Sequence, residues 1–342
     1  MTSAIATFDL LSPLLVGLIG FAASRASLCT VRAVAEVLTS QRAWLLTSFA
    51  KAAAWTTIVS GVVALASSAS APQVLERLPH GLGLAGGFLF GVGAAINGGC
   101  SLSTLQRLAD GDLSMLGTLT AYILGALAFN AVSRELGFTA LQALPTHWQG
   151  GHPWESALLC LLLLWASWEV VRLWRPAAAA IRFRQRLVSP AYRLSSTAAL
   201  LGIAGGLLYQ LQGSWTYTNY LRAVTASWLG AGAAPSAFHG LLLVALLGGM
   251  LFSSLQRGSF ALNRQWHLHL PRRLAGGFLM GIGGTLVPGG NDTLILSAIP
   301  TLSLWALFNY LSLLSGIAAV MLVTRAMSGH LPQVECVQDE CH

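Results

Sequence analysis

The stretch LAGGFLFGVG at residues 84–93 returns as LAGGFLMGIG at residues 274–283, and the two runs match at almost every position. The same offset, from position 84 to position 274, places VRAV at residues 31–34 on LRAV at residues 221–224 without a gap. Sequences rich in leucine, alanine and glycine match by accident, but two separated blocks that share one offset and an arginine indicate a duplication. We therefore predict a chain of two related halves.

The composition places both halves in a membrane. Of the 342 residues, 55% are hydrophobic and only 9% are charged, a balance that gives an ordinary soluble domain too little polar surface. The start of the chain, residues 1–8, lacks the basic region of a cleaved signal peptide, so the first span is expected to remain. The sequence predicts an all-α integral membrane protein with about nine transmembrane helices, at roughly 8–23, 44–66, 84–97, 114–132, 156–171, 196–209, 237–254, 274–288 and 304–324.

The basic residues indicate the orientation of these spans. A net charge of +7 suggests nucleic acid only where lysine and arginine gather on a soluble module, and this chain has none. If residues 172–195 are cytoplasmic, fifteen arginines lie on that side and three on the other. Because lysine and arginine are retained in the cytoplasm, we expect a multi-pass protein of the bacterial inner membrane with its N-terminus outside and its C-terminus inside.

The number of spans predicts that the two halves are inverted. Five crossings separate the first span from its counterpart at 196–209, and an odd number makes equivalent helices run in opposite directions. We expect a first membrane repeat at 1–171, a basic cytoplasmic linker at 172–195, a second repeat at 196–328 and a C-terminal tail at 329–342. Short spans that end in glycine-rich loops are typical of re-entrant segments around an enclosed site, although ordinary surface turns are the alternative.

Two polar loops in the first half carry a thiol among glycines and hydroxyls. They are SLCT at residues 27–30, with Cys29, and GGCSLST at residues 98–104, with Cys100. A thiol beside glycine backbone can offer S–H and N–H hydrogen bonds to a sulfur anion, and helix N-termini add a positive potential. The alternative is that a buried cysteine merely packs, which we assign to Cys160 in its apolar run. The remaining candidates for the pathway in these loops and in their counterparts of the second half are Asn97, Gly98, Gly99, Ser101, Ser103, Asn219, Gly289, Gly290, Asn291 and Asp292.

These motifs resemble a known family. The pattern GF at residues 20–21, Arg25 and Cys29, followed by GVG at residues 91–93, GGC at residues 98–100 and Ser103, is similar to that of the YeeE/YedE-type thiosulfate transporters. The resemblance covers nearly the whole chain. It implies a nine-span fold with loops entering from both sides, in which Cys29 and Cys100 line a passage and hand thiosulfate inward through S–H···S contacts.

The second half departs from the family pattern. Family members commonly carry a cysteine in the loop that reads PGGNDT here, so Gly290 stands where a third thiol is expected. This leaves thiosulfate, another sulfur oxyanion or a selenium analogue open as the substrate. The loop also holds Asp292, which is a candidate for proton coupling or, equally, a cap for the following helix.

Four other cations have two interpretations each. Arg32 and Arg222, which the offset pairs, either draw an anion into the two vestibules or pair with Glu36 and lipid headgroups. The same two interpretations apply to Arg25. Lys51, within a span, either faces the passage or extends to the inner interface, which we favour.

The tail brings His330, Cys336, Cys341 and His342 together, which suggests a metal site or a thiol that accepts sulfur, but the spacing fits no zinc motif. A cytoplasmic tail keeps its thiols reduced, so no disulfide is expected there. No enzyme motif is present, and we expect no cofactor, no metal and no nucleic acid, with membrane lipid and a cytoplasmic sulfur-carrier protein as partners. The alternatives are a membrane-embedded thiol redox or sulfur-transfer enzyme, a selenium-compound transporter, and an anion channel on the same fold.

Overall fold

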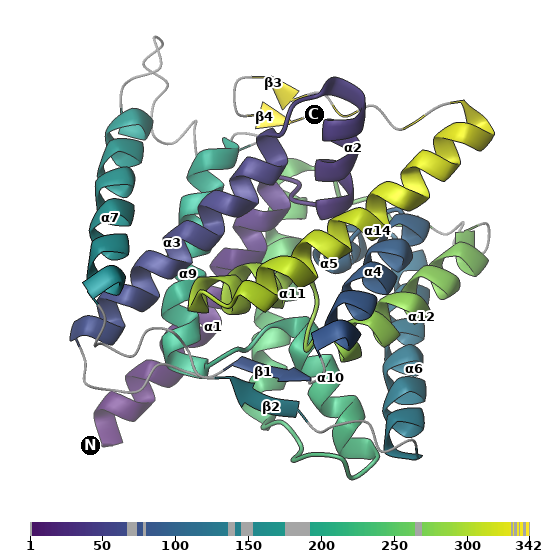
Figure 1. Cartoon of the computed structure of the whole chain (residues 1–342), viewed down its shortest axis with the longest axis horizontal. Helices are drawn as coiled ribbons and strands as arrows, with labels where there is room; N and C mark the ends of the chain where they lie inside the picture. The colour runs from purple at the N-terminus through teal and green to yellow at the C-terminus, as the bar shows by residue number, and fades with distance from the viewer. Residues whose placement is uncertain are drawn as a thin grey trace.

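The computed structural model describes residues 2–66, 74–77, 80–135, 141–144, 153–174, 192–263 and 269–329, together with 331, 334, 336–337 and 340–341. Within these residues, nine helices are long, the shortest of them being α12 (Figure 1). They are α1 (Thr2–Arg25), α3 (Trp44–Ala66), α4 (His80–Asn97), α6 (Ser114–Glu135), α7 (Pro153–Trp174), α9 (Leu194–Gln212), α11 (Ala237–Arg257), α12 (Leu270–Leu286) and α14 (Leu304–Ser328).

Eight of these nine helices are long and apolar enough to cross a membrane. The ninth, α12, packs between α4 and α6. The prediction of an all-α integral membrane protein is confirmed, and eight helices among the described residues qualify as spans where about nine were predicted.

Between the long helices lie short ones, which cannot cross a bilayer because a helix rises only about 1.5 Å per residue. These are α2 (Thr30–Ser40), α5 (Ser101–Ala109), α10 (Tyr217–Trp228) and α13 (Asn291–Thr293), the last continuing as a π-helical segment η2 (Leu294–Ala298) and a 3₁₀ turn η3 (Ile299–Thr301). Two small antiparallel ribbons join β1 (Val74–Arg77) to β2 (Leu141–Leu144) and β3 (Cys336–Val337) to β4 (Glu340–Cys341).

The helices repeat with the offset seen in the sequence. The starts of α4, α5 and α6, at His80, Ser101 and Ser114, precede those of α12, α13 and α14 by that same offset. Their contacts repeat as well, because α12 packs on α6 as α4 packs on α14, and α1 packs on α11 as α9 packs on α3. Equivalent short helices lie at opposite ends of the molecule, α2 near the top and α10 near the bottom of Figure 1. The repeat is therefore inverted.

The glycines of the repeated stretch form the contact between the two halves. A Cβ atom added to Gly93 would lie 2.7 Å from the carbonyl oxygen of Gly276, and one added to Gly276 would lie 2.7 Å from that of Gly93. Gly86 and Gly283 form the equivalent pair. Small residues allow helix backbones to approach closely in membranes, so the repeat is conspicuous in the sequence because packing requires it.

One buried ion-pair network ties the outlying helix α7 to the rest. The Nζ atom of Lys51 lies 2.7 Å from an Oε1 of Glu169, which also pairs with Arg172 at 2.7 Å, and both cations donate to Ser195. Lys51 thus joins α3 to α7 and to the start of α9.

The C-terminal tail contains a disulfide-bonded cysteine, which was not expected from the sequence. Cys336 is disulfide-bonded, and its backbone pairs with that of Cys341 across the β3–β4 ribbon. The prediction that the tail thiols stay reduced is wrong. The register of the ribbon places the two cysteines opposite each other, and their spacing in the sequence does not predict that register. His330, His342 and most of the predicted linker, residues 175–191, lie outside the described residues.

Candidate functional site

The two loop cysteines lie side by side. Cys29 is the residue before α2 and Cys100 is the residue before α5, and their side chains are 3% and 1% exposed. The Cys29 thiol donates to the Ser103 hydroxyl at 3.4 Å, and Ser103 donates to the carbonyl of Cys100 at 3.0 Å. The Cys29 and Cys100 thiols are also close enough to interact with each other. We call Cys29, Cys100 and Ser103 the thiol cluster.

The short helices α2 and α5 direct their first amide groups toward this cluster. The N-terminus of an α-helix leaves amide N–H groups without helical acceptors and carries a positive potential. Neither cysteine caps its helix with a side-chain hydrogen bond. The starts of both helices therefore favour a negative charge near the thiols.

Asn291 connects both helix starts to the second half. Its Nδ2 atom donates to the hydroxyl of Thr30 at 3.0 Å, and its Oδ1 atom accepts a short hydrogen bond from the hydroxyl of Ser101. Thr30 and Ser101 are the residues that directly follow the two cysteines. The first residue of α13 thus fixes α2 and α5 relative to each other.

A second cluster carries hydroxyls and a carboxylate in place of thiols. Thr218, near the start of α10, donates to Oδ1 of Asp292 at 2.7 Å and accepts from the backbone amide of Gly290 at 2.9 Å. The hydroxyls of Thr216 and Thr293 are 2.6 Å apart. We call Thr216, Thr218, Asp292 and Thr293 the carboxyl cluster.

The space for a third thiol is filled. Gly290 is the repeat counterpart of Cys100, and it is likewise the residue before its short helix. A Cβ atom at position 290 would lie 2.9 Å from Oδ1 of Asp292, 3.0 Å from the ring of Phe90 and 3.1 Å from the methyl of Thr218. The carboxylate of Asp292 therefore stands against the site at which the repeat would place a thiol. Its hydrogen bonds reach across to Thr218 on α10.

Other predicted residues hold the loops in place. Asn97 donates to the carbonyl of Gly99 at 2.9 Å and to the hydroxyl of Thr104 at 3.0 Å, and accepts from Thr118 at 2.8 Å. Gly98 and Gly289 have φ angles of +74° and +111°, values that glycine adopts without strain. These residues shape the turns from which α5 and α13 begin.

The structure places the predicted polar residues of α10 differently from the loop cysteines. The helix begins after Thr216, so Asn219, the offset counterpart of Cys29, lies within its first turn. Asn219 donates to the carbonyl of Ser214 at 2.8 Å and accepts from the guanidinium of Arg222 at 2.7 Å. Asn219 therefore holds Arg222, and Thr216 is the structural counterpart of Cys29.

The guanidinium of Arg25 has its partners outside the thiol cluster. Arg25, which is 1% exposed, donates to Gln256 at 2.5 Å and lies over the rings of Phe21 and Tyr192. Arg32 lies in the first turn of α2 and is partly exposed. Of these two, Arg25 serves packing between α1 and α11.

Two tyrosines that the sequence did not single out belong near the clusters. The hydroxyls of Tyr122 on α6 and Tyr310 on α14 are buried without a hydrogen-bond partner among the described residues. Tyr122 is close enough to Asp292, and Tyr310 to Cys100, for each pair to interact electrostatically. A buried phenol without an acceptor costs free energy, so both hydroxyls suit an anion that brings its own acceptors.

Two inverted halves, with short helices that begin at buried thiols and hydroxyls, define a multi-pass membrane protein of the transporter class. The family model described as Sulphur transport matches residues 25–319. The chain therefore belongs to the sulphur transport family, which confirms the resemblance to YeeE/YedE-type transporters. It is also similar to the thiosulfate transporter TsuA of Spirochaeta thermophila, with 26% identity over 325 residues, 85% of this chain and 92% of that protein.

Proposed function

We propose that this protein takes up thiosulfate, or a closely related sulfur oxyanion, across the bacterial inner membrane through the thiol cluster. Membership of the sulphur transport family supports a sulfur-containing cargo, and the relative named above supports thiosulfate in particular. In this proposal the cargo is handed to the cytoplasm or to a sulfur-carrier protein there.

The observation that carries the proposal is the contact of Cys29 with Cys100 through Ser103. These residues come from separate loops of the first half, yet they meet in the buried core, where the Ser103 hydroxyl and the Cys100 carbonyl lie among apolar side chains. Weak S–H donors match the soft terminal sulfur of thiosulfate, while O–H and N–H donors match its oxygens. Ser101, Tyr310 and the first amides of α2 and α5 supply such harder donors.

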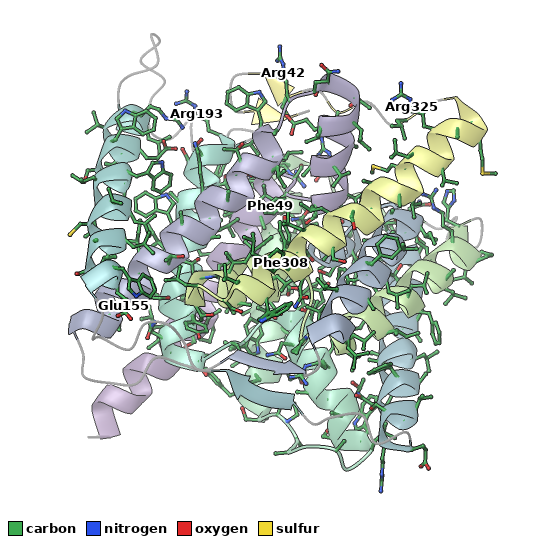
Figure 2. The ribbon with its side chains drawn as sticks, viewed as in Figure 1. Arg42, Phe49, Glu155, Arg193, Phe308 and Arg325 are labelled. Atoms are coloured by element: carbon green, nitrogen blue, oxygen red, sulfur yellow. The ribbon has the colours of Figure 1, made fainter. Side chains whose placement is uncertain are left out.

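The charges on the two faces support the proposed orientation. Arg42, Arg193 and Arg325 lie along one face of the molecule, opposite the end that holds Glu155 and the N-terminus (Figure 2). This face is the one to which the sequence assigns fifteen arginines, so we place it in the cytoplasm. The disulfide at Cys336 is unusual for a cytoplasmic tail, and a membrane-impermeant thiol reagent applied to intact cells after reduction will locate that tail.

The second candidate is a membrane-embedded sulfur-transfer enzyme. Its support is that both thiols are free and adjacent, so that one thiol can attack a sulfur bound to the other. In such an enzyme the thiolate of Cys29 or Cys100 attacks the outer sulfur of thiosulfate, the S–S bond breaks and sulfite leaves, and mass spectrometry of the protein after turnover detects the persulfide that remains. A transporter that works by S–H···S contacts leaves both thiols unmodified.

The test of transport is rescue of growth. We expect the chain to restore growth on thiosulfate to a bacterium that lacks its own uptake systems. Cys100→Ala removes a thiol from the cluster and is expected to abolish the rescue. Cys160→Ala is the matched control, because that thiol is exposed on α7, and it should support normal growth.

Equal growth with both variants would show that the thiols do not form the pathway. The substrate is then defined with purified protein in proteoliposomes, by competing the uptake of labelled thiosulfate with sulfate, sulfite and selenite. Competition by selenite alone would instead favour the selenium alternative. Flux that does not saturate would favour a channel.

A further inference from the structure

Asp292 is a buried carboxyl group that no ion pair compensates in the described part of the chain. Asp292 is 7% exposed. Its carboxylate accepts a hydrogen bond from the hydroxyl of Thr218 and a long one, of 3.5 Å, from the backbone amide of Thr218. Arg222, the cation on the same helix as Thr218, donates instead to Asn219. Hydroxyls and amides leave the full negative charge in place, and an uncompensated charge inside a membrane protein is costly.

The groups that interact electrostatically with this carboxyl from other elements are Tyr217 on α10 and Tyr122 on α6. Both are neutral at physiological pH in their ordinary state. Arg222 also interacts with Tyr122, and its guanidinium donates to Asn219. A proton is therefore the cation at hand that can neutralise Asp292 without a large rearrangement.

The location of Asp292 connects this proton to the cargo. Its Oδ1 atom stands 2.9 Å from where a Cβ atom of residue 290 would be, and residue 290 is the counterpart of Cys100. The neighbouring residue Asn291 touches the helix starts that follow both thiols. A divalent anion near the thiols repels an ionised Asp292 and so favours its protonated form.

We propose that Asp292 is the proton-carrying residue of this transporter and couples inward movement of a divalent anion to inward movement of one proton. The proton binds with the anion and leaves to the cytoplasm when the anion departs, so Asp292 returns to its ionised form in each cycle and one net negative charge moves inward with each divalent anion. This proposal rests on the proposed function and identifies the pH gradient as the driving force for uptake.

The experiment uses the full-length chain in proteoliposomes with labelled thiosulfate, the membrane potential being held at zero by potassium and valinomycin. With pH 7.5 on both sides the label should equilibrate. With pH 6.0 outside and pH 7.5 inside, the wild type should accumulate thiosulfate several-fold above equilibrium. Asp292→Asn should still exchange labelled for unlabelled thiosulfate but lose the accumulation, whereas Glu135→Gln, at an exposed carboxyl, should accumulate as the wild type does.

Asp292→Glu keeps a titratable group and should retain at least part of the accumulation, which tests the inference even if the amide variant does not fold. Accumulation by Asp292→Asn equal to that of the wild type would overturn the inference. So would a wild type that equilibrates thiosulfate but ignores the pH gradient, although transport itself would stand. Absence of any uptake by the wild type would remove both proposals.

Discussion

The thiol cluster and the carboxyl cluster occupy equivalent places in the two halves, yet they differ in chemistry. Each forms where short helices begin, and each is reached by the glycine-rich end of α4 or α12. The first presents Cys29 and Cys100, while the second presents Thr216 and Gly290, with Asp292 beside the latter. The duplication therefore preserved the close backbone packing of α4 and α12, while the side chains at the starts of the short helices diverged in chemistry.

The largest expected effect tests the shared backbone. Gly276→Leu places a side chain against the α4 backbone, where even a Cβ atom would lie 2.7 Å from the carbonyl oxygen of Gly93. Overpacking typically costs about 1–3 kcal/mol, and here neither backbone can move away without separating the halves. We expect a clearly lower unfolding temperature of the purified protein in detergent.

Gly248→Leu is the control for this substitution. Gly248 also lies within a long helix, α11, but no atom lies within 4 Å of where its Cβ atom would be. Its unfolding temperature should stay close to that of the wild type. If the two variants unfold alike, close approach of α4 and α12 does not hold the halves together.

A smaller effect is expected from making the two clusters alike. Gly290→Cys supplies the counterpart of Cys100, but the new side chain meets Asp292 at 2.9 Å and Phe90 at 3.0 Å. We expect thiosulfate uptake to fall several-fold, because the loop must shift to admit the sulfur. Adding Asp292→Ala removes the nearest clash and should restore uptake at equal pH on both sides. A single variant with normal uptake would show that position 290 lies outside the pathway.

The smallest effect concerns Asp112, in the turn between α5 and α6, which has no counterpart in the second half. Burial alone would raise the pKa of Asp112, but hydrogen bonds from Ser114 and the guanidinium of Arg107 outweigh it and hold the pKa below the usual value. A lowered pKa in the folded state stabilises the protein above the unfolded pKa of about 3.9, and this stabilisation is lost as the pH falls further.

Asp112→Asn keeps an acceptor for the helix start, because asparagine and aspartate cap about equally well, and loses only the charge beside the partly exposed Arg107, so it should cost less than about 1 kcal/mol at pH 7. The difference in unfolding temperature from the wild type should shrink when the pH is lowered from about 5 toward about 2. Glu135→Gln, at the far end of α6, should show no difference at either pH. A difference for Asp112→Asn that is constant with pH would mean that its charge has no part in stability.

The sequence predicted those features that depend on long, regular patterns. Apolar runs long enough to span lipid and a constant offset between the halves are visible in the sequence because lipid and close helix packing each impose them over many positions. Cys29, Cys100 and Asp292 stood out because thiols and carboxyls are conspicuous in polar loops. The contacts that these side chains make with other elements were not predictable, since they depend on the directions in which the short helices α2, α5 and α10 run after the long helices.

The sequence did not predict several other features, and the physical reason can be given for each. Tyr122 and Tyr310 were not singled out because both lie in apolar helices, where the sequence does not distinguish the face toward lipid from the face toward protein. Thr216 was missed because the ungapped offset points to Asn219, whereas α10 begins directly after Thr216. The Cys336 disulfide depends on the register of a very short ribbon that has no periodicity to read.

The two hydrogen bonds of Asn291 have a mechanical consequence. A single side chain of the second half restrains the leading residues of both thiol-bearing helices, at Thr30 and Ser101. If the proposed function holds, we expect an arriving anion that competes for these hydroxyls to loosen both helices in one event, so that binding of the cargo and separation of these contacts between the two halves become the same step.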